Sequence, residues 1–221
     1  MRPDVQVRLR GRSSSHFTRV ARIFAHELDV PVEFDVVHDL TSLDAAAYDG
    51  HPALKIPTLR VGDAAIFGTD NICRKLTELA GRADDPRVVL SARLPSDFAR
   101  NAQELVWIAM TTQVQLVVGI RFAQLPADNL FFTKAAAGMT GALAWLDARL
   151  DLVLAELPND RDLSVFEVAL FCLVEHLDFR PTVSLGALPR LRRFASEFAS
   201  RESARRTAFR VDPPRAPETE S

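Results

Sequence analysis

Hydrophobic and polar positions follow a strand pattern at the start of the chain. Val5, Val7 and Leu9 alternate with polar residues, which is the period-2 signature of a short strand, and Gly11 ends it. Residues 17–30 then carry apolar side chains at intervals of three and four residues, which predicts a helix. The first 30 residues therefore predict a strand followed by a helix.

A second strand and a β-hairpin are expected next. Pro31 stops the helix, and residues 32–37 form another apolar strand pattern. After a polar stretch that we interpret as a loop with one weak helical turn, residues 56–61 predict a strand. Gly62–Asp63 is a two-residue hairpin signal before the return strand 64–67.

A helix over residues 71–81 completes the first domain. Thr69 or Asp70 can cap its start, and Gly81 ends it. The order βαβ–ββα is that of a thioredoxin-like α/β domain, which we place at residues 1–81.

Beyond residue 95 the pattern is helical throughout. Residues 82–95, rich in Asp, Arg and Pro, are interpreted as a linker. Four long segments then carry apolar residues at helical spacing: 96–119, 132–157, 163–179 and 188–209. No strand pattern returns, so we predict an all-α helical domain over 96–210. The proline-rich polar residues 211–221 are expected to be a disordered tail.

Charge and cysteine content narrow the classes of partner and compartment. A formal net charge of -2 over 221 residues gives no reason to expect nucleic acid or an anionic membrane as a partner. Cys73 and Cys172 lie far apart in apolar stretches, which indicates small core residues in a reducing compartment. The N-terminus lacks a secretory apolar core, and no apolar run approaches the ~18 residues of a membrane helix. We expect a soluble cytoplasmic protein.

Four motifs stand in the order and spacing of segments in one known protein family. Residues 15–22, SHFTRVAR, resemble the family's turn of Ser or Cys into a helix with spaced arginines. Residues 51–59, HPALKIPTL, resemble its segment with a cis-proline, and residues 67–76, FGTDNICRKL, resemble the segment that opens its third helix. Ser164 and Glu167 resemble its capping box before a buried helix.

These motifs together resemble those of the cytosolic glutathione S-transferases, and the resemblance covers residues 5–209. It carries implications for activity and assembly. It implies a detoxification transferase that uses glutathione as co-substrate, needs no metal and forms a homodimer. The family dimerises by packing the first domain of one subunit on the helical domain of the other. Arg74 and Lys75 lie on the helix where that interface would form.

Ser15 stands where the family places the group that contacts the thiol of glutathione. The thiolate is the nucleophile, and a hydroxyl donor at a helix N-terminus favours the anion. Ser15 could instead be a plain N-cap, and Ser13 or Ser14 could do either job. His16 stands where the family often has proline; it could add positive charge near the thiolate, but we expect it to face solvent.

The turn also argues against two subclasses. Zeta-class maleylacetoacetate isomerases carry Ser-Ser-Cys here, whereas this chain has Ser-His-Phe after its second serine. A cysteine-type thioltransferase is disfavoured because the turn contains no cysteine.

The resemblance assigns the rest of the glutathione site to two segments. Pro57 is expected to follow a cis peptide bond, leaving the backbone of Ile56 to pair with the cysteinyl part of glutathione. Lys55 could contact a glutathione carboxylate. Thr69 aligns with the family's serine, which binds the γ-glutamyl carboxylate at a helix N-terminus by donating hydrogen bonds to it. Asp70 could contact the ammonium group or only support the helix dipole.

Gly68 is the chief departure from the family. The family places Glu or Asp there, whose carboxylate pairs with the γ-glutamyl ammonium, and glycine cannot do so. Losing one charge-assisted hydrogen bond costs ~1.5–3 kcal/mol, so the glutathione site is expected to be weak rather than displaced.

The second substrate is expected to bind between the domains. The resemblance places Trp107, Met110 and Thr111 on the long helix that lines this electrophile pocket, although apolar residues there are more often core. The leading function is conjugation of the glutathione thiolate to small apolar electrophiles. The alternatives are a non-catalytic binding or regulatory module, which Gly68 favours, and a glutathione-dependent isomerase or dehalogenase that shares the same site.

Overall fold

The computed structural model describes residues 6–213, and these residues form two units. Residues 6–83 and 207–213 lie in the first unit, and residues 84–206 form the second. The end of the described chain therefore returns to the unit in which the chain begins. Val5, which we included in the first strand, lies outside the described residues.

The first unit is built on a four-stranded mixed sheet with strand order β2-β1-β3-β4. Its strands are β1 (Val7–Gly11), β2 (Glu33–Val36), β3 (Thr58–Val61) and β4 (Ala64–Phe67). β1 and β2 are parallel, while β3 pairs antiparallel with both β1 and β4. The predicted thioredoxin-like domain is confirmed.

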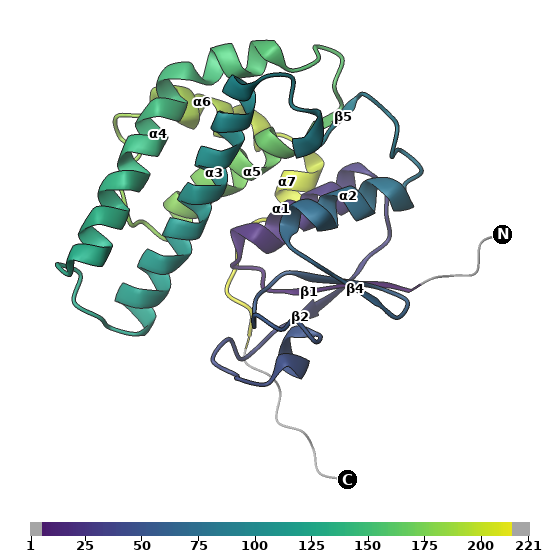
Figure 1. The fold of residues 1–221 in the computed structure, drawn as a ribbon, viewed down its shortest axis with the longest axis horizontal. Helices are drawn as coiled ribbons and strands as arrows, with labels where there is room; N and C mark the ends of the chain where they lie inside the picture. Colours follow the sequence, from purple (N-terminus) through teal and green to yellow (C-terminus); the bar gives the residue numbers. More distant parts are fainter. Residues whose placement is uncertain (1–5, 214–221) are drawn as a thin grey trace, which may run out of the picture. The chain divides into compact units, whose positions relative to one another are not determined.

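One face of this sheet is covered by α1 (His16–Glu27) and α2 (Thr69–Leu79), which pack against each other (Figure 1). Leu9 and Leu59 point into this layer and are 1% and 0% exposed, because alternate strand residues face the same side. Gly11 lets α1 approach β1 closely. A Cβ atom on Gly11 would lie 2.5 Å from the side chain of Thr18, so alanine would not fit there.

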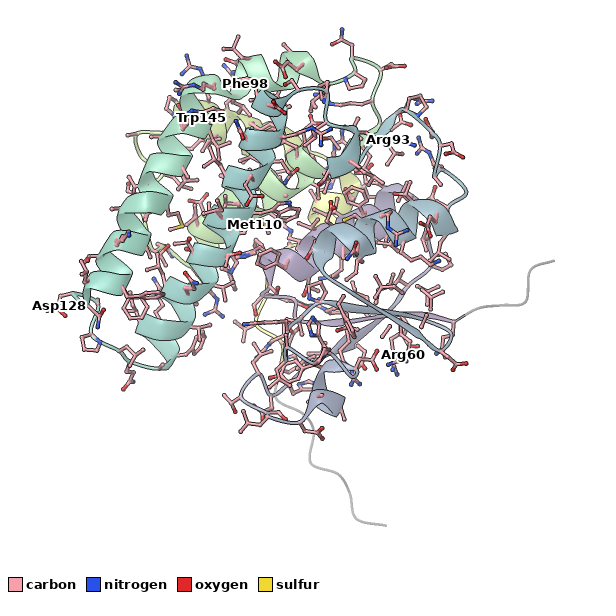
Figure 2. All side chains as sticks on the ribbon, in the orientation of Figure 1. Arg60, Arg93, Phe98, Met110, Asp128 and Trp145 are labelled. Carbon is pink, nitrogen blue, oxygen red and sulfur yellow. The ribbon has the colours of Figure 1, made fainter. Side chains whose placement is uncertain are left out.

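The other face carries arginines on its two central strands. Arg8 on β1 lies directly opposite Arg60 on β3, and both donate to the buried carboxylate of Asp49, at 2.9 and 3.1 Å. Asp49 follows the short 3-10 helix η1 (Ala45–Tyr48), which confirms the helical turn that we expected in this loop. Arg60 extends from the sheet on the side away from α1 and α2 (Figure 2). This face is therefore held by ion pairs.

The second unit is helical, as predicted. Its main helices are α3 (Asp97–Leu116), which continues as the π-helix η3 (Val117–Phe122), α4 (Leu130–Glu156), α5 (Val165–Phe179), α6 (Pro189–Phe198) and α7 (Glu202–Arg206). α3 and α4 run antiparallel (Figure 1), and the Phe98 and Trp145 rings meet across them at 5.4 Å (Figure 2). α5 packs against α3 and α6. Eleven of its fifteen residues are buried, so α5 forms the core of this unit.

Two boundaries differ from the sequence prediction. Residues 82–95 are not simply a linker, because β5 (Val88–Val89) pairs in parallel with β6 (Leu163–Ser164) and both valines are buried. The helix expected over 188–209 is interrupted between α6 and α7 at residues 199–201. Local apolar spacing does not reveal either difference. The β5 strand depends on pairing with a distant segment, and the break between α6 and α7 is too short to disturb the helical pattern.

The expected capping box before α5 is wrong. Ser164 is the N-cap residue, but its side chain makes no capping hydrogen bond. Glu167 accepts two hydrogen bonds from Arg161, at 2.6 and 2.8 Å, instead of reaching back to the cap. The carboxylate that the capping box requires is therefore paired with an arginine on the preceding loop.

The stretch Asp97–Phe122 is long and apolar enough to cross a membrane by length and composition, contrary to our expectation for this chain. In the structure α3 packs against α4 and α5, which is the position of a core helix in a helical bundle. This one helix is weak support for a membrane span.

Both cysteines are core residues, as predicted. Cys73 lies on α2 and Cys172 on α5, and both are 0% exposed. The cytoplasmic location that we inferred partly from them stays a prediction.

Candidate functional site

The predicted glutathione-binding residues of the first unit lie in segments next to one end of the sheet. Arg10 pairs with Thr58, and Thr58 pairs with Phe67, so the end of β1, the start of β3 and the end of β4 lie in one row. Neighbouring strands are ~4.8 Å apart. The segments next to this row are residues 12–15, 55–57 and 68–70, and we call them together the sheet-end site.

Ser15 caps α1 at this end of the sheet. Its backbone is extended, and its Oγ accepts the Thr18 N–H at 3.2 Å. The Ser15 N–H donates to the carbonyl of Arg12 at 3.1 Å, which closes a tight turn over residues 12–15. A hydroxyl that accepts one hydrogen bond can still donate its own hydrogen to another group. Capping the helix and contacting a thiolate are therefore compatible roles for Ser15.

The other two serines of the turn are arranged differently. Ser13 is 1% exposed, and its N–H donates to the carboxylate of Asp212 at 2.8 Å. Ser14 is half-buried in the middle of the turn. Ser15 is thus the serine of this run whose side chain caps α1.

His16 is buried, and our expectation that it faces solvent is wrong. It is 1% exposed, and its ring lies 4.8 Å from that of Phe17. The residue is the first of α1, where the helix lies against β1. Sequence reasoning missed this because the burial of a helix's first residue depends on what packs over it.

The Ile56–Pro57 peptide bond is cis, as predicted. Within the described part of the chain, neither the N–H nor the C=O of Ile56 makes a hydrogen bond. An extended ligand could therefore pair with this backbone as an added strand would. Lys55, the neighbouring candidate, is exposed.

The backbone at the start of α2 depends on Gly68. Gly68 is the N-cap residue, with φ 84° and ψ 130°, and no side chain caps the helix. The first N–H groups of a helix have no partner inside it, so Thr69 and Asp70 lie where a carboxylate could bind. Thr69 is 8% exposed and Asp70 is exposed.

Gly68→Ala is expected to lower the free energy of unfolding by about 1–3 kcal/mol, because φ 84° is strained for any residue with a Cβ atom. Chemical denaturation measures this change. Gly138→Ala on α4 is the control: its added Cβ meets nothing within 4 Å, and alanine should be slightly stabilising in a helix. A Gly68→Ala protein as stable as the wild type would contradict the strain argument. Glutamate at position 68 would bring the same strain with the family's carboxylate.

His51, from the same segment as Pro57, is half-buried and packs against Phe67. Its Nδ1 accepts the Ala53 N–H at 3.1 Å, and its ring lies 4.3 Å from that of Phe67. Burial lowers the pKa of His51, its own backbone hydrogen bond opposes this, and the charge of Lys55 lowers the pKa further. The segment before β3 therefore holds an imidazole of lowered pKa close to Lys55.

The largest omission of the sequence analysis is the C-terminal segment. Asp212, which we placed in a disordered tail, is 5% exposed and hydrogen-bonded to the serine turn. The prediction for 211–213 is corrected by this contact, and residues 214–221 lie outside the described part of the chain. The available signal was the pair of arginines on α1, Arg19 and Arg22, which need counter-charges from elsewhere in the sequence where they are buried.

The three residues predicted for the electrophile pocket share α3 in the second unit. Trp107 is half-buried, Met110 is 0% exposed and Thr111 is exposed. Met110, labelled in Figure 2, lies within the core and presents no surface to a ligand here. Their role in binding a second substrate stays a prediction. Among the described residues, no group of three or more His, Cys, Asp or Glu side chains is placed to hold a metal ion.

Comparison with known proteins places the fold. Residues 14–79 match the family described as "Glutathione S-transferase, N-terminal domain". Among functionally curated proteins, no sequence matches the chain.

Several solved structures share the fold along nearly the whole chain. A glutathione transferase family member from Pseudomonas fluorescens Pf-5, with bound glutathione, is 21% identical with a TM-score of 0.76 over 93% of this chain and 100% of that one. A glutathione S-transferase from Methylobacillus flagellatus KT, also with glutathione bound, is 20% identical with a TM-score of 0.73 over 92% and 100%. At these identities the likeness shows the fold. The resemblance inferred from the motifs is confirmed at that level.

Proposed function

We propose that this chain, whose fold is that of the glutathione S-transferase superfamily, binds glutathione at the sheet-end site and transfers its thiolate to small apolar electrophiles. The observation that carries the proposal is the strand register, which sets the Ser15 turn, the open backbone of Ile56 and the start of α2 at one end of the sheet. Two structures with this fold contain bound glutathione, which supports the same ligand here.

Each part of the tripeptide has a chemical counterpart in this arrangement. The γ-glutamyl carboxylate would bind the N-terminal N–H groups of α2 at Thr69 and Asp70. The cysteinyl backbone would pair with Ile56, and Lys55 would attract a carboxylate. The thiol would then lie beside Ser15, whose hydroxyl and helix N-terminus favour the thiolate. Ser14 and His16 belong to the same turn and would border the ligand. Trp107 and Thr111 stay our candidates for the electrophile pocket, whereas Met110, which was predicted with them, is buried in the core of the second unit.

Retention on immobilised glutathione tests the binding step. The protein should be retained and then released by free glutathione, because the ligand competes for the sheet-end site. Thr69→Val should weaken retention, since it removes a hydroxyl at the start of α2. Thr140→Val is the matched control, because the Thr140 hydroxyl donates to the Ala136 carbonyl on the exposed side of α4. Release by salt instead of glutathione would argue against a specific site.

A non-catalytic binding or regulatory module is the second candidate, and Gly68 favours it. No carboxylate can extend from Gly68 to pair with the γ-glutamyl ammonium. A protein that binds glutathione but conjugates no model aryl halide would support this candidate. Isomerase or dehalogenase activity would use the same thiolate and is separated from conjugation by substrate trials.

We also propose a homodimer in the cytoplasm. The second unit exposes large apolar side chains on α4, among them Leu130 at 79% and Leu152 at 63%, and such surfaces often mark interfaces. Arg74 and Lys75 on α2 each pair with Glu78, so both are held in place on the predicted dimer helix. Sedimentation should give twice the 24.5 kDa chain mass at micromolar concentration. A mass near that of one chain would exclude the dimer.

A further inference from the structure

The C-terminal segment 207–213 crosses the first unit near the serine turn and is held at separate points. Thr207 is 0% exposed, and its Oγ1 lies 3.5 Å from Nε of Arg19 on α1. The guanidinium of Arg19 also lies over the ring of Phe209, 4.3 Å from its centroid. In Figure 1 this segment, drawn in yellow, runs past the start of α1.

Two further contacts bring the segment to the sheet-end site. The carboxylate of Asp212 accepts the Ser13 N–H at 2.8 Å, and His38 Nδ1 lies 3.1 Å from the carbonyl of Pro213. His38 comes just after β2, and the register pairs Val36 with Gly11 at the end of β1. The end of the described chain therefore lies at the same end of the sheet as Ser15.

Asp212 is a buried carboxylate among arginines. Its side chain is 2% exposed, and its carboxylate oxygens lie 3.9 Å from Nε of Arg12 and 4.0 Å from Nε of Arg210. Burial and the charge of Arg210 lower the pKa of Arg22, whereas the charge of Asp212 acts in the opposite direction. The negative charge of Asp212 thus offsets part of the charge of guanidinium groups that are partly removed from water.

The hydrogen bond to Ser13 bears directly on Ser15 through one peptide group. The N–H of the Arg12–Ser13 peptide donates to Asp212, and the C=O of the same peptide accepts the Ser15 N–H at 3.1 Å. Because a peptide group is planar, fixing its N–H also fixes the direction of its C=O. Asp212 therefore orients the carbonyl that holds the backbone of Ser15.

We propose that Asp212 is a positioning residue for Ser15, acting through its hydrogen bond to the Ser13 N–H. This inference rests on the proposed function for the role of Ser15, but the contact that it invokes exists without any ligand. Without the carboxylate, the Arg12–Ser13 peptide can rotate and the Ser15 hydroxyl loses its fixed position. A misplaced catalytic group slows the reaction even when substrate binding is retained.

Amide hydrogen exchange in the ligand-free protein tests the positioning step. Asp212→Ala should speed exchange at Ser13 and Ser15, because both N–H groups depend on the peptide that Asp212 holds. Val211→Ser is the matched control. Val211 is next to Asp212 in the sequence but is 68% exposed, so its substitution should leave exchange unchanged. Unchanged exchange in Asp212→Ala would overturn the proposal whether or not the protein uses glutathione.

Kinetics test the consequence for chemistry. Asp212→Ala should lower kcat about tenfold while the Kd for glutathione changes less than about threefold, since Asp212 holds the turn and not the ligand. Asp212→Asn keeps an oxygen that can accept the Ser13 N–H, so it should recover most of kcat. An unchanged kcat in Asp212→Ala, or Asp212→Asn as slow as Asp212→Ala, would overturn the proposal. If the wild type fails to bind glutathione, the proposed function fails and amide exchange alone decides the positioning step.

Discussion

Ser15→Ala is expected to slow conjugation of glutathione to a model aryl halide by about 10²–10³-fold, the usual cost of removing one donor from a developing anion. The Ser15 hydroxyl lies at the N-terminus of α1, where the helix dipole also favours negative charge. Without it, the pKa of bound glutathione should rise and less thiolate should form at neutral pH. Glutathione affinity should change much less, because the other two segments of the sheet-end site are intact.

The same substitution has a separate, smaller effect on stability. Ser15 Oγ accepts the Thr18 N–H, and losing such a cap costs about 1 kcal/mol. Ser15→Thr should restore both the cap and the donor, whereas Ser14→Ala should affect neither. Steady-state rates, the ultraviolet absorbance of the bound thiolate and a thermal melt measure the three effects separately. If Ser14→Ala abolishes conjugation and Ser15→Ala does not, the assignment within the turn is wrong by one residue.

Deletion of residues 211–221 is expected to destabilise the protein by about 3 kcal/mol, because it removes the buried carboxylate of Asp212, which accepts the Ser13 N–H and lies near Arg12, whose side chain is only 22% exposed. The sequence alone suggested the opposite, since this stretch is polar, rich in proline and without an apolar anchor. Removing one partner of a buried ion pair costs more than the pair contributes, since an uncompensated charge stays behind.

A thermal melt measures this effect, and about 3 kcal/mol corresponds to a fall of roughly 6–12 °C in Tm for a chain of this size. Deletion of residues 214–221 alone is the matched control, because every contact described for Asp212 is retained. A protein lacking 211–221 that melts like the control would show that the ion pairs contribute nothing to stability.

Much of the first unit could be predicted because its signals are local. The alternation of Val7 and Leu9, the Gly62–Asp63 turn and the Pro31 stop each specify backbone within a few residues. The cis bond before Pro57 was inferred from a resemblance and is confirmed. Helical periodicity likewise predicted α3, α4 and α5, whose apolar stripes mark the packed sides of the second unit.

Other features of the site and of the fold could not be predicted from local sequence patterns. The burial of His16 and the ion pair that draws Glu167 away from its expected cap depend on residues that neither motif contains. The pairing of β5 (Val88–Val89) with β6 (Leu163–Ser164) joins strands that are separated by a long helical stretch of sequence. A pattern of residues along the chain does not show which distant residues pack against them in the folded protein.

The sequence by itself determined where the strands, helices and turns of the first unit occur, and that a helix follows the serine run at residues 13–15. Tertiary structure alone decided what holds that serine, because the hydrogen bond from Ser13 to Asp212 joins residues 199 positions apart. Steric clashes limit the backbone conformations that neighbouring residues can adopt, so short-range elements can be predicted from sequence. A single buried carboxylate at the far end of a polar segment has no periodicity, and only the arginines around it in the folded chain give it a place.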